Sequence, residues 1–277
     1  MRSAYNHPMD WSRIRLLCCL PAILFISPAT AAENTLASTL APTGTLRAAF
    51  LGDNPSLGRV DRQAGTVTGP VADIVKELAR RIGVPYTLIP ATDARDIINR
   101  MKAHTADLGF MAYNAGRAAD VDFSSPWLLM PNSYIVRTDS PLQKVADADR
   151  EGIHIAAVKN DTQDVYLSAH LKNNRVDAVP AMPPPDEMES LLVSGKVDAF
   201  AANRQRIMEI VNRHPKLRVL PDNFFVAGQA IAVPKGNPSN LEGLNQMLAE
   251  ILGTSFVKDS ISRAGLQGVD AALPPGR

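Results

Sequence analysis

Hydrophobic positions along the chain follow two alternating periods, which predict a strand, then a helix, then a strand again. Residues 45–51 (TLRAAFL) form a short apolar run that is typical of a buried strand. Residues 70–83 (PVADIVKELARRIG) instead place apolar side chains at helical spacing. Pro70 suits the first helical position and Gly83 suits the C-terminal cap, so we expect an amphipathic helix between them.

The same alternation continues in two arrays of similar size. The first array continues with an expected strand at Pro85–Ile89, a helix capped by Asp93 and a strand at Asp107–Met111. Strands alternating with helices favour a parallel sheet with helices on its faces, so we predict an α/β fold with two lobes. The second array is predicted as the strand Gly152–Val158, the helix Thr162–Leu171, the strand Val176–Val179, the helix Asp186–Val193, the strand Val197–Ala201 and the helix Arg204–Val211.

Two further apolar stretches predict how the lobes are joined. Ser133–Arg137 and Gly228–Val233 are apolar enough to be strands that cross between the lobes. Helices at Leu241–Leu252 and Ser255–Ala264 would then return to the first lobe. The expected boundaries are residues 44–136 for the first part of lobe 1, 137–227 for lobe 2 and 228–277 for the return to lobe 1.

The start of the chain has the pattern of a secretory signal peptide, which we expect to span residues 1–31. Arg13 and Arg15 precede the apolar run Leu16–Ile26, and Ala29-Thr30-Ala31 supplies a cleavage site of small residues. The apolar run is shorter than the roughly 20 residues of a membrane-spanning helix. Translation from Met9 is an alternative start, and a short polar leader, Glu33–Thr43, is expected to follow the signal.

Both cysteines, Cys18 and Cys19, lie within this segment, so we expect the exported protein to have no thiols or disulfides. Lipid anchoring at Cys18 is an alternative, but Leu16-Leu17 lacks the small residue that lipoprotein processing requires. Removing residues 1–31 changes the formal net charge from +1 to about −1. A near-neutral chain with interspersed charges has no basic stripe, so no nucleic-acid partner is expected.

The segment Ala112 to Trp127, AYNAGRAADVDFSSPW, contains the strongest candidate for binding chemistry. Its Arg117 lies in a loop of small residues, and a planar guanidinium donates two parallel hydrogen bonds to a carboxylate. This residue type therefore suits an anionic ligand. The alternative is a surface pair with Asp120 or Asp122, which contributes only about 0 to 1 kcal/mol.

This segment resembles a signature of the bacterial extracellular solute-binding proteins of family 3. Three further stretches match that family in the correct order: Gly69–Gly83, Gly195–Ala202 (GKVDAFAA) and Ala230–Asn237 (AIAVPKGN). The resemblance covers the chain from about Thr45 to Val269. It implies a two-lobed, periplasmic-binding-protein-like fold of type II with two crossing hinge strands. It also implies a monomeric periplasmic protein that delivers a small molecule to an inner-membrane ABC permease without performing chemistry.

The resemblance places Arg117 on the arginine that holds the ligand carboxylate, with Ala112, Tyr113 and Asn114 as its neighbours on the first lobe. Tyr113 either stacks over the ligand or packs against the lobe. On the second lobe, KNDTQD (159–164) resembles the helix start whose hydroxyl and backbone N–H groups hold the other side of the carboxylate. Thr162 fits that position.

Two residues depart from the family pattern. Asp161 would repel an anionic ligand unless Lys159 or a ligand ammonium offsets its charge; alternatively it is only the helix N-cap. Asn203 stands near the position of an aspartate that pairs with the α-ammonium of amino-acid ligands, and it carries no charge. Asn203 is alternatively the N-cap of the following helix. We therefore expect a small carboxylate-bearing or amino-acid-like ligand, anionic or zwitterionic.

The chain contains no HExxH, GxSxG, Walker or dinucleotide-binding motif, so we expect neither catalysis nor a cofactor. The histidines are scattered singly and indicate no metal site, while Met182 and Met188 are interpreted as packing residues. One alternative is an enzyme resembling cyclohexadienyl dehydratase, for which Asp161 is the candidate proton donor. Another is a binding subunit for a sensor or for a periplasmic oxidation system.

Overall fold

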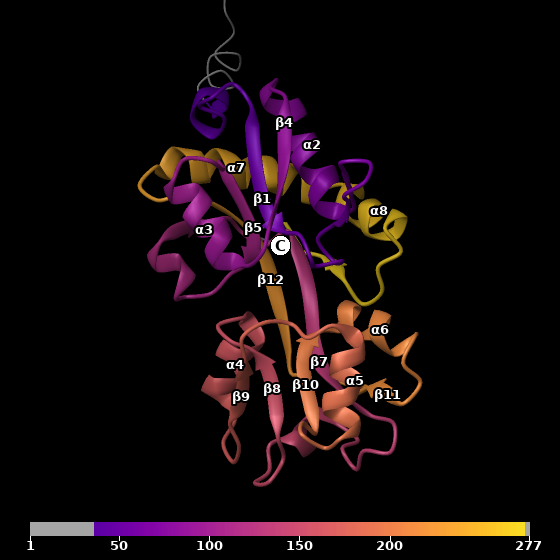
Figure 1. The fold of residues 1–277 in the computed structure, drawn as a ribbon. Coiled ribbons are helices and arrows are strands. Elements are labelled where there is room, and N and C mark those ends of the chain that lie inside the picture. Colours follow the sequence, from indigo (N-terminus) through magenta and orange to yellow (C-terminus); the bar gives the residue numbers. More distant parts are fainter. Residues whose placement is uncertain (1–35, 275–277) are drawn as a thin grey trace, which may run out of the picture.

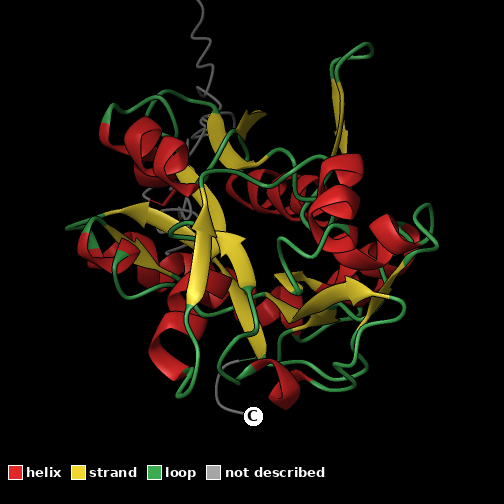
Figure 2. Cartoon of the chain, turned by 60° about the horizontal axis from the view of Figure 1, so that its bottom comes forward, coloured by secondary structure: helices red, strands yellow, loops and turns green. Residues whose placement is uncertain are grey.

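The structure, a computed structural model, describes residues 36–274 and consists of two lobes joined by two long strands (Figure 1). The upper lobe in the figure holds the N-terminal part of the described chain together with the C-terminal helices, and the lower lobe holds the middle of the chain. Figure 2 shows helices lying around the strands of the molecule. The α/β fold with two lobes and two crossing strands, predicted from the sequence, is confirmed.

The elements of the first lobe follow the predicted order. Helix α2 begins at Pro70, and Gly83 after it adopts a left-handed conformation with φ 72°, as the sequence predicts. Asp93 caps α3 by accepting a hydrogen bond from the Asp96 N–H at 2.8 Å. The lobe contains β1 (Leu46–Leu51), β2 (Arg59–Asp61), β3 (Thr66–Thr68), α2 (Pro70–Ile82), β4 (Tyr86–Ala91), α3 (Ala94–Lys102), β5 (Leu108–Ala112), η1 (Arg117–Ala119), β6 (Val121–Phe123), α7 (Pro238–Leu252), α8 (Phe256–Arg263) and β13 (Asp270–Ala271).

In the second lobe, two strands differ from their predicted bounds. The strand expected from Gly152 begins only at Ile155, because Gly152 forms a turn with φ 83° and the His154 N–H donates to the Asp198 carboxylate. The strand expected at Val197–Ala201 is shifted toward the C-terminus. The lobe contains η2 (Val145–Ala148), β8 (Ile155–Val158), α4 (Thr162–His170), β9 (Val176–Val179), α5 (Pro185–Val193), β10 (Ala199–Asn203), α6 (Arg204–Val211) and β11 (Leu217–Val219).

The crossing strands are β7 (Leu128–Arg137) and β12 (Phe225–Pro234), each ten residues long and longer than predicted. They pair antiparallel through their N-terminal halves, residues 128–132 with 225–229, and the sheet order is β4-β1-β5-β12-β7-β10-β8-β9. Strands β4, β1 and β5 are mutually parallel in the first lobe, as are β10, β8 and β9 in the second. Ligands of such sheets bind outside the carboxyl ends of the parallel strands.

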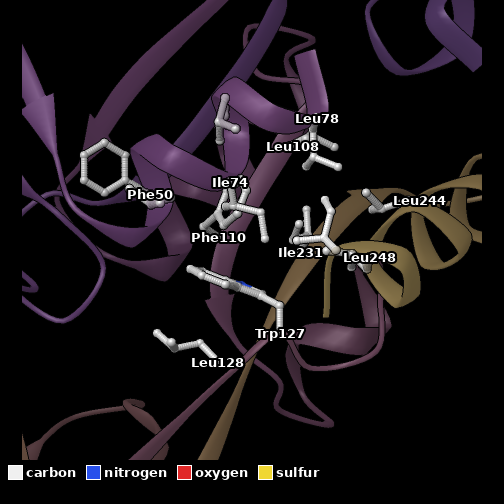
Figure 3. Close-up of a cluster of buried hydrophobic side chains, with 14 of the residues drawn as sticks. Phe50, Ile74, Leu78, Leu108, Phe110, Trp127, Leu128, Ile231, Leu244 and Leu248 are labelled. Carbon is white, nitrogen blue, oxygen red and sulfur yellow. The ribbon is translucent and has the colours of Figure 1, made fainter. Parts of the chain in front are cut away.

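Trp127 lies at the centre of the first lobe's hydrophobic core and is fully buried (Figure 3). Its ring meets that of Phe110 edge to face, with 5.8 Å between the centroids. Leu244 and Leu248 of α7 belong to the same cluster. The C-terminal helices therefore return to the first lobe, as the sequence analysis expects.

The stretch expected to be a short polar leader contributes to this core. Residues 36–40 are helical, and Leu40 and Ala41 are each only 3% exposed. Leu36 lies against Gly243 of α7. A Cβ atom added at Gly243 would lie 2.7 Å from the Leu36 side chain, so this close packing requires glycine. Leu36 and Leu40 are four positions apart and so share one helix face, a spacing that the sequence analysis overlooked.

Glu77 of α2 pairs with Arg80 and Arg81 of the same helix, and these ion pairs stabilise the protein in a way that depends on pH. The hydrogen bond from Arg80, together with that from Arg81, lowers the pKa of Glu77 to about 2, from 4.5. A carboxyl group whose pKa is lower in the folded than in the unfolded protein stabilises the fold at any pH above the unfolded-state pKa. This stabilisation is lost as the pH falls from about 4.5 toward 2. Glu77→Gln should cost about 1 kcal/mol at pH 7, because solvent screens the pair. Urea unfolding at a series of pH values from 7 to 3 should show the difference in unfolding free energy between Glu77→Gln and the native protein becoming smaller. A constant difference would contradict the ion-pair role of Glu77.

None of the helices in residues 36–274 has the length and apolar composition needed to cross a membrane. The predicted signal peptide, with Cys18 and Cys19, lies outside the described residues.

Candidate functional site

A cleft of about 1060 Å³ lies between the two lobes. Its walls are the loops that follow the carboxyl ends of the parallel strands of both lobes, the place where α/β sheets bind ligands. The floor includes residues of the crossing strands. The segments after these strands contribute Asp53 and Asn54 after β1, Thr92 and Asp93 after β4, Asn114, Gly116 and Arg117 after β5, residues 159–163 after β8, and residues 180–182 after β9. Helix α6, which follows β10, contributes Arg206.

Arg117 projects from the first lobe across this cleft. Its Nη1 donates to the carbonyl oxygen of Ala112 at 3.1 Å, and its Nη2 donates to that of Asn160, on the second lobe, at 3.3 Å. The same Nη2 lies 3.7 Å from Oδ1 of Asp161. The side chain is only 10% exposed, and burial lowers the pKa of the guanidinium, while Asp161 and Asp93 oppose that shift. The Arg117 guanidinium is therefore a positive charge between the lobes that little water reaches.

The alternative surface pairing of Arg117 is wrong. Asp120 pairs with Lys102 at 2.6 Å, and Asp122 accepts a hydrogen bond from the Gly236 N–H. Arg117 therefore keeps its charge directed at the cleft.

Two of the three predicted neighbours of Arg117 line the cleft. Ala112 supplies the carbonyl that orients the guanidinium, and the Asn114 side chain accepts from the Gly116 N–H at 2.7 Å, which shapes the loop. Tyr113 is not among the lining residues. Its side chain is exposed and meets Phe123 edge to face at 5.5 Å, so in this structure it packs against the lobe.

Helix α4 presents its N-terminus to the cleft from the second lobe. Thr162 begins the helix and lines the cleft, as expected. Asp161 occupies the N-cap position, but its side chain accepts no capping hydrogen bond, so the interpretation that it serves only as the cap is wrong. Asp164 instead accepts from the Asn160 N–H at 2.8 Å. Burial raises the pKa of Asp161, and Arg117 and Arg206 oppose that shift.

Asn203 lines the cleft at the end of β10 and also caps α6. Its Oδ1 accepts from the Arg206 N–H at 2.9 Å and lies 3.4 Å from the Ser56 hydroxyl of the first lobe. The alternative role of Asn203 as an N-cap is therefore confirmed, and its oxygen is already bonded within the protein.

The sequence analysis missed an ion pair that joins the lobes. Arg206 of α6 donates to the carbonyl oxygen of Asp53 and lies 2.9 Å from its carboxylate. Arg59 and Glu209 form a second pair between the lobes at 2.5 Å. Asp53 follows β1 closely, as Asp93 follows β4, so a polar residue just after a strand was the available signal for both.

Gln229 of β12 was also missed. It lines the cleft, is 4% exposed, and its Oε1 has no hydrogen-bond partner within the described chain. Asn132, on the other crossing strand, has partners by contrast: its amide nitrogen donates to the Met130 carbonyl, and its amide oxygen accepts from Gln163 at 2.7 Å. Gln229 therefore has a buried acceptor without a donor, an atom that is itself covered by its surroundings.

The predicted packing residues have different surroundings. Met188 is fully buried in the core of the second lobe, while Met182 lies at its edge and lines the cleft. His214 is mostly buried and pairs with Glu189 at 2.5 Å. Within residues 36–274, no group of three or more His, Cys, Asp or Glu side chains is placed to hold a metal ion.

Comparisons with known proteins agree with this geometry. The model of the family described as "Bacterial extracellular solute-binding proteins, family 3" matches residues 46–258. No curated protein matches the chain.

Solved structures with the same fold include proteins of different roles. A mutant of ArgBP from T. maritima is 23% identical, with a TM-score of 0.65, and the match covers 84% of this chain and 99% of that one. The ancestral amino acid-binding protein AncCDT-1, a precursor of cyclohexadienyl dehydratase, is 21% identical with a TM-score of 0.65 over 83% and 98% of the chains. A histidine kinase sensor domain similar to periplasmic binding proteins is 21% identical with a TM-score of 0.67 over 83% and 98%. At these identities the likeness establishes the fold.

Proposed function

The chain belongs to the bacterial extracellular solute-binding proteins, family 3, and from this premise we propose that it captures a small carboxylate-bearing metabolite between its lobes and delivers it to an inner-membrane ABC permease. In this proposal Arg117 holds the ligand carboxylate from the first lobe. The start of α4, with Thr162, holds it from the second. No chemistry is performed on the ligand, and the protein acts as a monomer in the periplasm after loss of the signal peptide.

The observation that carries the proposal is the position of Arg117. The Arg117 guanidinium is nearly buried and reaches from the first lobe to the start of α4 in the second. The helix N-terminus offers free N–H groups and the positive end of the helix dipole, so both groups favour an anion at the same place. Desolvation strengthens charge-assisted hydrogen bonds at such a position. A carboxylate bound there touches both lobes, so its binding favours the closed shape that a permease recognises.

One observation favours a second candidate, an enzyme on the same fold. Asp161 is a carboxyl group in the cleft whose pKa burial raises, and a proton donor needs such a group. A dehydratase would convert a cyclohexadienyl carboxylate during incubation. Recovery of every added carboxylate unchanged, by mass spectrometry after overnight incubation, supports the binding protein over the enzyme.

A thermal-shift screen of free carboxylates tests the proposal. We expect at least one small amino acid, hydroxy acid, keto acid or dicarboxylate to raise the Tm by about 5–10 °C, because a ligand at 100 times its Kd adds about 2.7 kcal/mol. The corresponding amides or esters, which lack the negative charge, should give no shift. Equal shifts from the acids and their amides would argue against a carboxylate site.

A further inference from the structure

Helix α6 of the second lobe bonds to the first lobe at two points outside the cleft. Glu209 accepts a hydrogen bond from the Arg59 guanidinium of β2 at 2.5 Å. Gln205 accepts through its Oε1 from the Gln267 N–H at 2.7 Å. Figure 1 shows α6 at the upper edge of the second lobe, next to the segment that follows α8 and contains Gln267. None of these four residues lines the cleft, so they join the lobes beside the volume that a ligand would fill.

The two points are connected through one buried side chain. Gln205 is 6% exposed, and its Nε2 donates to Oε1 of Glu209 at 2.9 Å while its Oε1 accepts from Gln267. The amide is thus satisfied at both ends, as a buried polar group requires. It also holds the Glu209 carboxylate where Arg59 meets it, which reduces the side-chain entropy that this ion pair loses when it forms. We call these four residues the α6 contact.

Each side of the α6 contact moves with its own lobe. Arg59 lies in the separate two-stranded sheet of β2 and β3, and Val60 next to it packs against the core of the first lobe. Ile207 of α6 belongs to the core of the second lobe. Because hinge motions rotate lobes as rigid bodies, a rotation about β7 and β12 that opens the cleft separates Arg59 from Glu209. The α6 contact therefore forms only when the lobes are close together, as in this structure, an arrangement that we call closed.

We propose that the α6 contact stabilises the closed arrangement independently of the ligand and so sets how much of the protein is closed before binding. Its bonds join protein groups alone, so they form with any ligand or none. A ligand that needs the closed arrangement binds with an apparent Kd that falls as the closed fraction rises. The inference goes beyond the proposed function, because it holds whatever the cleft binds.

Electron-spin distance measurements on the protein without ligand test this inference. Nitroxide labels at Arg62→Cys, beside β2, and Arg213→Cys, just after α6, report the closed and open populations in the chain from Ala32 on, which contains no other cysteine. Arg59→Gln should lower the closed-to-open ratio about two- to fivefold, the effect of losing one exposed ion pair. Glu209→Arg should lower it at least about fivefold, because it places two cations together. Exchanging the two charges, Arg59→Glu with Glu209→Arg, should restore the ratio to within about twofold of the native value.

Arg263→Gln is the matched control. Arg263 pairs with Asp73 within the first lobe, and the two side chains are 61% and 33% exposed, against 57% and 33% for Arg59 and Glu209. Losing this pair should leave the closed-to-open ratio unchanged. Raising NaCl from about 0.1 M to 1 M should lower the ratio of the native protein more than that of Arg59→Gln, because salt screens exposed charges.

Far-UV circular dichroism verifies that each variant is folded, and Arg59→Gln, on a surface strand, decides the outcome if Glu209→Arg does not fold. An unchanged ratio in Arg59→Gln overturns the inference. A native protein found only in the open arrangement without ligand overturns it as well. Either result leaves the proposed function standing, because the thermal-shift screen tests carboxylate binding separately.

Discussion

Replacing Arg117 by alanine is expected to weaken carboxylate binding by more than about 30-fold while the Tm changes by only a few degrees. Truncating one partner of a desolvated, charge-assisted hydrogen bond costs about 2–5 kcal/mol of binding free energy. The side chain is 10% exposed, so water replaces it poorly. The fold should tolerate the change, because the variant loses the cost of keeping this guanidinium desolvated together with its long ion pair to Asp161. Isothermal calorimetry with the best acid of the screen measures the effect.

Two variants separate the role of the guanidinium from that of a positive charge. Arg117→Lys keeps the positive charge but loses the two parallel N–H donors of the guanidinium. Its affinity for the carboxylate should lie between those of the native protein and Arg117→Ala. Arg95→Ala removes an exposed arginine that lines the same cleft and should change the affinity by less than about threefold. If Arg117→Ala binds as tightly as the native protein, Arg117 is not the carboxylate site.

Truncating Trp127 to alanine is expected to cost about 3–5 kcal/mol of unfolding free energy, the typical range for a large aromatic side chain lost from a core. Trp127 has no exposed surface and packs among residues from β5, β7, β12 and α7 (Figure 3). Its removal leaves a cavity where the crossing strands meet the first lobe. Urea unfolding followed by circular dichroism gives the value.

Trp127→Phe should cost less than half as much, because it keeps a ring against Phe110 and removes an indole N–H that has no partner in the described chain. Tyr113→Ala is the control, since that aromatic side chain is 55% exposed, and it should cost under about 1 kcal/mol. Equal losses in Trp127→Ala and Tyr113→Ala would show that Trp127 does not organise this core.

Local signals in the sequence predicted the order of most helices and strands, and the family resemblance predicted how the two lobes are joined. The apolar spacing of α2 with Pro70 and Gly83 at its ends, and the cap at Asp93, depend on neighbouring residues alone, and the structure confirms them. The bounds of β7 and β12 were predicted too short because strand length depends on pairing with distant strands. The apolar face of residues 36–40 was missed because it acquires a partner only when α7 returns to the first lobe.

The candidate site was predictable only in part. Arg117, Thr162 and Asn203 were identified from motifs, and all three line the cleft. The pairing of Arg206 with Asp53 was not predictable, because 153 positions separate the two residues in the chain. The unmet acceptor on Gln229 is likewise invisible in the sequence, since it depends on which side chains fail to reach it.

The central claim is that Arg117 and the start of α4 close on the carboxylate of one small ligand. A crystal structure with the acid that gives the largest thermal shift tests it most directly. The claim predicts both carboxylate oxygens within hydrogen-bond distance of the Arg117 guanidinium, and the ligand in contact with Thr162 or the α4 N–H groups. A ligand bound elsewhere, with Arg117 still donating to the Asn160 carbonyl, would contradict it.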